Sequence, residues 1–385
     1  MDEKLFLVET GDENGNSTEL FLPATEYELL DVQDRLRMTE GEELQAEILE
    51  CGDFALLMRL QGLYSLNSLN ALSKMLINLD ERGAEAFQGL VLMEYAKCNT
   101  YKDIAAERLI ELASNTDCCH VLPGIRDDEQ LGHFYVEYGF LSDMDGLSDE
   151  VLQYLDWARI GREQREAEGG VFTEEGYVVQ DGEIEPLDEK MDFTPHKPEY
   201  VFRLALQRAE EMKPIFVELP MEDNELRLTL KEHGMPDAIL SCDGPLPQLD
   251  AKRELEDGLQ TLNTLAWKIQ ELDTLQMQKL KALQHVLKLV EPVDLLQIAD
   301  RMEDYLVEPS IKNLEDYGQS ELQFYLGKEE MERLLPYVNL RGYGKAAMEH
   351  LHDQLTPYGT IQRQDGEPIV SMEQELQRGG GMTLT

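Results

Sequence analysis

Carboxylates are the residues of this chain whose number and spacing could do chemistry. The 385 residues include 78 Asp and Glu against 34 Lys and Arg, a formal net charge of -44. They are densest between residues 127 and 189, where 19 acidic residues accompany three arginines. Carboxylates at this density attract a basic protein surface and repel nucleic acid and acidic membranes. We therefore take twelve of them as candidate partner-binding residues: Asp127, Asp128, Glu129, Asp143, Asp145, Asp149, Glu150, Glu163, Glu166, Glu168, Glu174 and Glu175.

Two other interpretations of such a stretch are a solvated surface and an adaptation to high salt. Repulsion among so many charges costs folding stability, so a chain that keeps them is expected to use them. The lysine content and the Leu-rich apolar composition argue against salt adaptation. Arg159, Arg162 and Arg165 follow one another at three-residue spacing, which predicts local salt bridges on a helix.

A metal site is suggested by Cys118-Cys119-His120, with Asp117 and His133 nearby. Zinc ligands are usually separated by two to four residues, and this spacing does not match. We predict buried cysteines at a helix end and no metal.

Catalytic machinery is not recognisable in the sequence. The histidines lie in unrelated contexts, and no Gly-x-Ser-x-Gly motif accompanies them. The glycines of the segment 341–345 have neither the spacing nor the preceding strand of a phosphate-binding loop. We predict a protein that is not an enzyme and needs no cofactor.

The sequence around these carboxylates occurs twice. Residues 69–72 read Leu-Asn-Ala-Leu, and residues 262–265 read Leu-Asn-Thr-Leu, an offset of 193. Other matches keep the same order while the offset falls from 197 to 183. They are Leu22-Pro23 with Leu219-Pro220, Gly132 with Gly318, Tyr154 with Tyr337, Gly161 with Gly344, Thr173 with Thr356, and Gly176 with Gly359. A period of this length is that of a domain, which indicates duplication.

Hydrophobic periodicity predicts mixed helix and strand in both halves. In the first half we expect strands at 4–9, 19–22 and within 47–57, and a hairpin at 171–179. We expect helices at 27–36, 69–79, 86–95, 101–114 and 148–160. In the second we expect a strand at 214–219, helices at 262–272, 280–290, 295–302 and 328–335, and a closing segment at 355–361. The predicted fold is α+β, with two tandem homologous domains at 1–185 and 201–364, an acidic Pro-containing linker at 186–200 and a flexible tail at 365–385.

Composition places the protein among soluble, cytoplasmic chains. Apolar residues make up 42%, no run of about 18 of them could span a membrane, and the amino terminus lacks the apolar core of a signal peptide. Five cysteines, two of them adjacent, do not make a disulfide framework. Residues 1–190 contain 43 acidic and 14 basic residues, so they contribute -29 of the total charge of -44.

Two segments of the first half resemble a known family. Residues 65–72, continuing through Leu79, Gly83 and Phe87, resemble the central helix pair of ArdA antirestriction proteins. Residues 154–162 and 170–178 are similar to the closing helix and hairpin of that family. The resemblance covers residues from about 20 to 180 and returns more faintly at 262–272 and 337–361. The chain differs from the family in its length, about twice the usual, and in having Asn67, Asn70 and Asn78 where the family tends to be acidic.

The resemblance implies an elongated, acidic mimic of duplex DNA, carried by mobile genetic elements for evasion of host defence. Such an inhibitor occupies the DNA-binding groove of a type I restriction–modification enzyme, as a homodimer or here as a single-chain pseudo-dimer. B-DNA has one charge per roughly 1.7 Å of axis, so an excess of 44 charges would match about 75 Å. The sequence leaves two alternatives open: a mimic directed at another defence complex such as a CRISPR effector, and an acidic adaptor that binds a basic protein.

Overall fold

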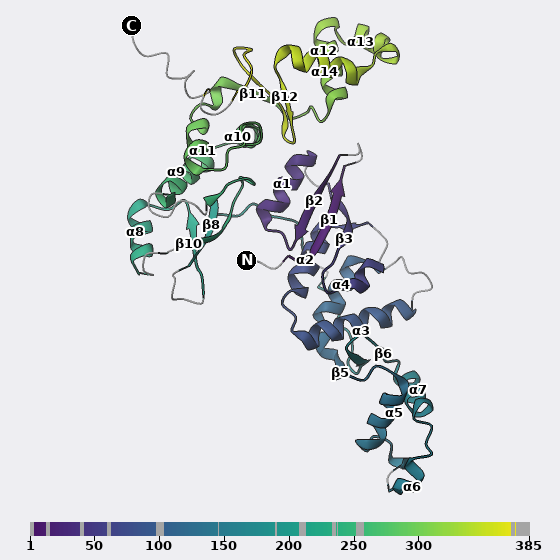
Figure 1. The fold of residues 1–385 in the computed structure, drawn as a ribbon. Coiled ribbons are helices and arrows are strands. Elements are labelled where there is room, and N and C mark those ends of the chain that lie inside the picture. The colour runs from purple at the N-terminus through teal and green to yellow at the C-terminus, as the bar shows by residue number, and fades with distance from the viewer. Residues whose placement is uncertain are drawn as a thin grey trace. The chain divides into compact units, whose positions relative to one another are not determined.

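The computed structural model describes residues 4–12, 16–38, 42–59, 63–97, 104–144, 146–188, 191–207, 213–232, 236, 238–251, 258–370 and 374 (Figure 1). Asp145 lies outside these residues, as does most of the predicted tail, 371–373 and 375–385. The side chains of Asp143 and Asp149 are not described.

The chain packs as two units that do not follow the sequence order strictly. The amino-terminal unit comprises residues 2–24 and 41–194, and the carboxy-terminal unit comprises residues 25–40 and 195–385. The helix at 26–36 thus packs with the carboxy-terminal unit, although it lies early in the sequence. The domain boundaries at 185 and 200 remain predictions.

The amino-terminal unit contains two antiparallel sheets joined by helices. The first sheet has the strand order β2-β1-β3-β4, and the second has the order β5-β7-β6. The strands are β1 (Phe6–Gly11), β2 (Ser17–Leu22), β3 (Gln45–Glu50), β4 (Tyr64–Ser65), β5 (Cys119–Pro123), β6 (Val171–Phe172) and β7 (Gly176–Gln180). The helices are α2 (Leu66–Leu76), α3 (Glu81–Lys97), α4 (Ala106–Ser114), α5 (Asp128–Glu137), α6 (Asp149–Leu152) and α7 (Trp157–Glu168). Short 3₁₀ helices lie at Ala55–Arg59, Thr116–Cys118 and Ser142–Met144.

The carboxy-terminal unit repeats this plan. Its sheets have the orders β9-β8-β10 and β12-β13-β11. The strands are β8 (Phe202–Gln207), β9 (Ile215–Leu219), β10 (Ala238–Asp243), β11 (Tyr305–Glu308), β12 (Gln354–Thr356) and β13 (Gly359–Arg363). The helices are α1 (Glu26–Leu36), α8 (Asp223–Glu232), α9 (Gly258–Gln270), α10 (Thr274–Leu287), α11 (Pro292–Ala299), α12 (Leu314–Leu326), α13 (Lys328–Leu334) and α14 (Leu340–Leu351), with 3₁₀ helices at Met302–Asp304 and Leu335–Tyr337.

The elements from β1 to β7 and those from β8 to β13 follow one another in the same order, with α1 matching α8, α5 matching α12 and α7 matching α14. We call these series the first repeat and the second repeat. The mixed helix and strand content confirms the predicted α+β class. The prediction of strand through residue 57 was wrong in part, because β3 ends at Glu50 and a 3₁₀ helix follows.

The repeated glycines lie where two helices cross. A Cβ atom on Gly161 of α7 would lie 1.8 Å from the Asp128 carbonyl oxygen of α5, and one on Gly132 would lie 2.1 Å from the Trp157 carbonyl oxygen. The second repeat has the same crossing: a Cβ atom on Gly344 would lie 2.0 Å from the Leu314 carbonyl oxygen. Only glycine lets the two backbones approach this closely.

The repeated asparagines join a helix to the loop after the second strand. The Asn70 amide accepts from the Ala24 backbone N–H at 2.6 Å and donates to its carbonyl oxygen at 3.1 Å. Asn263 makes the same two bonds with Met221, at 2.9 and 2.8 Å. Both side chains are buried, so each satisfies a backbone donor and acceptor that water cannot reach.

The helix α1 is bound to the carboxy-terminal unit through a buried ammonium group. Lys281 Nζ of α10 lies 2.9 Å from Asp31 Oδ1 and 2.6 Å from Asp34 Oδ2, and the Tyr358 hydroxyl donates to Asp31 at 3.0 Å. Burial alone lowers the pKa of Lys281, but the two carboxylates raise it above its ordinary value. Thr25 begins the helix with a capping box to Glu28.

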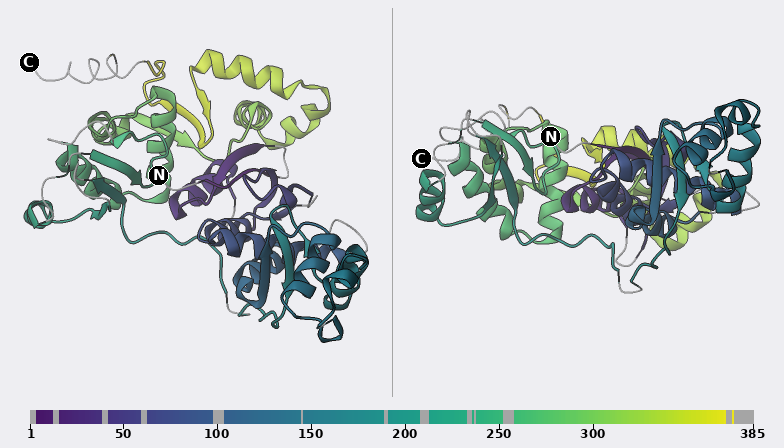
Figure 2. Two further views of the ribbon diagram at one scale, coloured as in Figure 1. Left: turned by 60° about the horizontal axis from the view of Figure 1, so that its bottom comes forward. Right: turned by 90° about the horizontal axis from the view of Figure 1, so that it is seen from below.

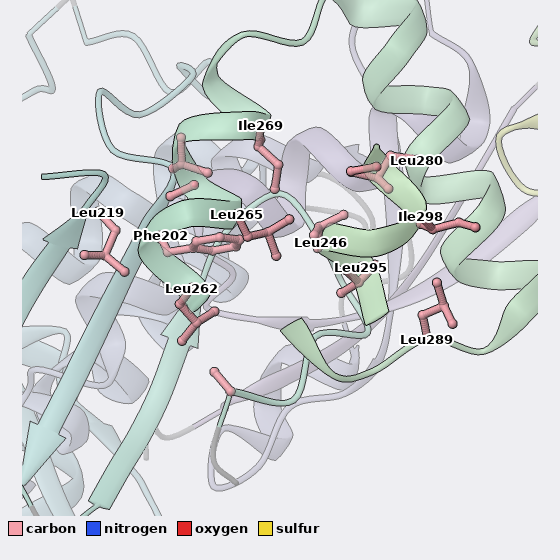
Figure 3. Close-up of a cluster of buried hydrophobic side chains, with 14 of the residues drawn as sticks. Phe202, Leu219, Leu246, Leu262, Leu265, Ile269, Leu280, Leu289, Leu295 and Ile298 are labelled. Carbon is pink, nitrogen blue, oxygen red and sulfur yellow. The ribbon is translucent and has the colours of Figure 1, made fainter. Parts of the chain in front are cut away.

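The core of the carboxy-terminal unit combines residues from the first sheet of that unit with residues from α9, α10 and α11. Figure 3 shows Phe202 and Leu219 together with Leu262 and Leu265 of α9, while Leu280 and Leu295 come from the next two helices. Burial of such side chains stabilises the fold by roughly 1.5–3 kcal/mol each before entropy is counted. In the described part of the chain, no helix has the length and apolar character needed to cross a membrane.

Candidate partner-binding surface

The candidate carboxylates gather on one module of the amino-terminal unit, the helix pair α5/α7 with α6 and the β6–β7 hairpin. Figures 1 and 2 show α5 and α7 packed side by side, an arrangement that the glycine crossing permits. The sequence analysis predicted a helix at 148–160 and none at 128–137, so it missed α5 and therefore the helix pair. Residues 127–180 contain 14 acidic residues and three arginines.

Some of these carboxylates are neutralised inside the module. Asp128 Oδ1 lies 2.8 Å from Arg165 Nε, and Asp128 Oδ2 lies 3.5 Å from Arg162 Nε. The hydrogen bond from Arg165 lowers the pKa of Asp128 below its ordinary value. Arg159 pairs with Glu163 at 2.8 Å within α7, so the predicted local salt bridge is confirmed for Arg159. It was wrong for Arg162 and Arg165, which pair with Asp128 of the neighbouring helix α5. Glu175 likewise pairs with Arg126 at 2.9 Å.

Other carboxylates of the module carry uncompensated charge. Glu129, Glu150, Glu166 and Glu174 are exposed, and none of them forms an ion pair with a described residue. Asp127 is also exposed, and its side chain caps α5 by accepting from the Gln130 backbone N–H at 2.8 Å. These five are the predicted site residues that best suit an external cation.

Glu168 has a different environment. Its carboxylate accepts hydrogen bonds from the Tyr135 hydroxyl at 2.6 Å and from the Tyr177 hydroxyl at 3.2 Å. Burial and the charge of Glu168 raise the pKa of both tyrosines. No cation lies near enough to neutralise Glu168 among the described residues, so its charge stays available at the end of α7.

A row of carboxylates that the sequence analysis missed crosses the first sheet. In the strand register Glu9 of β1 lies directly opposite Glu19 of β2 and opposite Glu47 of β3. All three are exposed, and none forms an ion pair with a described residue. Neighbouring strands lie roughly 4.8 Å apart, so the three carboxylates form a line about 10 Å long. Like charges directly opposite one another are destabilising, which makes the row unexpected for a merely solvated face.

The described strands of the second repeat carry no such row. At the equivalent register Ala205 of β8 lies opposite Phe216 and Ser241. One pair further along, Arg203 lies between Glu218 and Asp243, and its guanidinium contacts Glu218 at 2.7 Å. Two sheets of one topology thus carry different charge, unbalanced in the first repeat and balanced in the second.

The adjacent cysteines connect the 3₁₀ helix Thr116–Cys118 to β5. Cys118 and Cys119 are buried, as predicted, and burial raises the pKa of the Cys119 thiol to about 12. His120 points to Asp181, with Nε2 at 2.7 Å from the carboxylate. Among the described residues, no three His, Cys, Asp or Glu side chains are grouped as metal ligands.

Comparison with known proteins adds no relative: no family model matches the sequence, and no curated protein is similar to it.

Proposed function

We propose that the protein is an ArdA-like antirestriction inhibitor, a mimic of duplex DNA that occupies the DNA-binding groove of a type I restriction–modification enzyme. In this proposal the two repeats are homologous domains that arose by duplication. The observation that carries it is the row Glu9, Glu19 and Glu47, because a line of unpaired like charges costs stability and is expected to persist only where it is used.

The mechanism is competition without bond making or breaking. The groove of a DNA-binding enzyme places Lys and Arg where phosphates will lie, and those cations meet the unpaired carboxylates of the first repeat instead. The row on the sheet and the carboxylates of the α5/α7 module supply this charge. The second repeat contributes less, because residues 313–363 contain eight acidic and five basic residues.

Titration of a type I restriction complex bound to a labelled duplex tests the proposal. We expect the protein to release the duplex at one inhibitor per groove and excess duplex to reverse the effect. The Debye length falls from about 10 Å at 0.1 M salt to about 3 Å at 1 M, so the association rate should fall steeply with salt. Inhibition well below one inhibitor per groove, or inhibition that duplex cannot reverse, would refute groove occupancy.

Matched neutralisations distinguish mimicry from general acidity. Glu9→Gln with Glu19→Gln and Glu47→Gln should weaken inhibition about tenfold, since each exposed pair contributes up to about 1 kcal/mol. The control is Glu222→Gln with Glu225→Gln and Glu232→Gln, which removes equal charge from exposed positions of the second repeat. Equal losses from both sets would favour a diffuse acidic adaptor. Activity against a CRISPR effector with no effect on the restriction complex would redirect the same mechanism to another target.

A further inference from the structure

Aromatic rings are exposed at the end of α5, within the most acidic part of the chain. Tyr138 and Phe140 are 66% and 62% exposed, although rings of this size are usually covered. Both pack on Phe134, with ring centroids at 4.8 and 5.7 Å. The three rings form one continuous aromatic patch, to which Tyr135 adds a contact with Phe140 at 5.6 Å.

Carboxylates lie beside this patch, and neither Glu137 nor Glu168 forms an ion pair with a described residue. Glu137 precedes Tyr138 and is exposed. Glu168 reaches the patch through its hydrogen bond with Tyr135. Residues 127–158 contain no Lys or Arg at all. Rings next to unneutralised carboxylates suit a guanidinium group, which stacks on a ring while it pairs with an acid.

The molecule uses this combination elsewhere for its own cations. Four cations of the described residues contact a ring and also pair with a carboxylate. These are Arg165 with Phe172 and Asp128, Arg203 with Tyr200 and Glu218, Arg363 with Tyr305 and Asp365, and Lys281 with Tyr358 and Asp31. At the end of α5 the ring and carboxylate parts are present, and the cation has to come from outside.

We propose that the patch of Phe134, Tyr138 and Phe140, with Glu137 and Glu168, binds arginine side chains of a basic protein partner. This inference rests on the proposed function, because the arginines in question are those of the DNA-binding groove that the first repeat would occupy. Charge complementarity decides the occupant: a second copy of this chain would bring another strongly acidic α5/α7 module to the same place.

The second repeat provides a natural control. Phe324 and Tyr325 at the end of α12 are 82% and 63% exposed, so rings are present there too. The positions that match Glu137 and Glu168 are Gln323 and Leu351, and Lys328 follows the rings. This second patch has no carboxylate at either of the two matching positions and has a cation close by in the sequence, so it should prefer arginine less than the first patch does.

Binding of oligoarginine and oligolysine peptides of equal length to the full chain tests the proposal by fluorescence anisotropy. Tyr138→Ser with Phe140→Ser should lower the arginine-to-lysine affinity ratio about fivefold and leave oligolysine binding nearly unchanged. Phe324→Ser with Tyr325→Ser should leave the ratio as it is in the parent chain. An unchanged ratio in the first variant, or an equal fall in the second, would overturn the proposal.

Sedimentation of the same variants addresses the competing occupant. If Tyr138→Ser with Phe140→Ser converts an oligomer to a monomer, a second copy covers the rings and arginine recognition is refuted. The peptide experiment can succeed or fail independently of the proposed function. A chain that selects arginine through these rings but fails to release DNA from a restriction complex would keep this inference and lose only the target.

Discussion

The two repeats share a backbone plan and differ in charge. The first three strands of each repeat are ordered alike, as β2-β1-β3 and β9-β8-β10, and β4 extends the sheet of the first repeat alone among the described residues. Each repeat has a helix pair crossing at two glycines and an asparagine that joins helix to loop. Residues 127–180 have 14 acidic and three basic residues, whereas residues 313–363 have eight and five. The residues that make packing contacts are therefore the same in the two repeats, whereas the charged residues differ.

A second difference concerns the helices α1 and α8, which hold the same place in the two series. On α1, Asp31 is buried and pairs with Lys281, while the residue of α8 that matches Asp31 is Leu228, which is 59% exposed. The two repeats therefore differ at this helix, because α1 pairs with Lys281 of α10 and α8 presents an exposed leucine at the matching position.

The largest effect is expected at this buried ion pair. Lys281→Met should lower the free energy of unfolding by about 3–5 kcal/mol, because Asp31 would remain buried without its cation. Leu228→Ala on the exposed face of α8 is the control and should change stability little. Urea denaturation of the full chain measures both. A small loss for Lys281→Met would show that α1 does not depend on this contact.

The glycine crossings should respond alike in the two repeats. Gly161→Ala and Gly344→Ala should each cost about 3 kcal/mol, since the new methyl group overlaps a backbone oxygen of the facing helix. Glu166→Ala, exposed on α7, serves as a control for helix content. Thermal unfolding followed by circular dichroism measures the loss of stability in each variant. A marked cost in one repeat alone would mean that the crossings are not equivalent.

The asparagine bridges should also match. Asn70→Ala and Asn263→Ala each leave a backbone N–H and carbonyl oxygen without their partner, at a cost of about 2 kcal/mol. The control is Asn78→Ala, because the Asn78 amide donates to the Lys74 carbonyl oxygen at an exposed position. Unequal losses for the two buried asparagines would indicate that one loop is held in another way.

An acid of the second repeat should make stability depend on pH. Burial raises the pKa of Asp353, and the Tyr317 hydroxyl donates to Oδ2 at 2.6 Å. A carboxyl whose pKa is raised on folding stabilises the fold below its unfolded pKa, and this contribution is lost as pH rises through the folded value. Asp353→Asn should therefore raise stability at pH 7 by about 1 kcal/mol and change it less near pH 4. Denaturation at the two pH values measures this, and a loss at pH 7 would contradict the assignment.

The smallest effects separate the two sheets. Glu9→Gln should raise stability by about 0.5–1 kcal/mol at low salt, because it relieves repulsion with Glu19 and Glu47. Arg203→Gln should lower stability by a similar amount, because it removes the cation that lies between Glu218 and Asp243. Both effects should shrink as salt is added. If both substitutions changed stability in the same direction, the two sheets would not differ in charge balance as described.

The sequence by itself predicted the mixed helix and strand content and the helices around Leu69 and Leu262, which the structure confirms, and it indicated a duplication. These features depend on local periodicity and on residues such as Gly161 that packing requires, so they can be read without knowing the contacts. The salt bridge of Arg159 with Glu163 followed in the same way, since neighbours on a helix face are set by the helical repeat.

Only the tertiary structure decided which carboxylates share a surface. Glu9, Glu19 and Glu47 lie far apart in the sequence, and their alternation with apolar residues indicates an exposed face but not the register that aligns them. The pairing of Lys281 with Asp31 likewise joins residues 250 positions apart. Contacts of this kind depend on how strands and helices pack, which no local pattern encodes, and they distinguish an acid that pairs within the fold from one that is available to a partner.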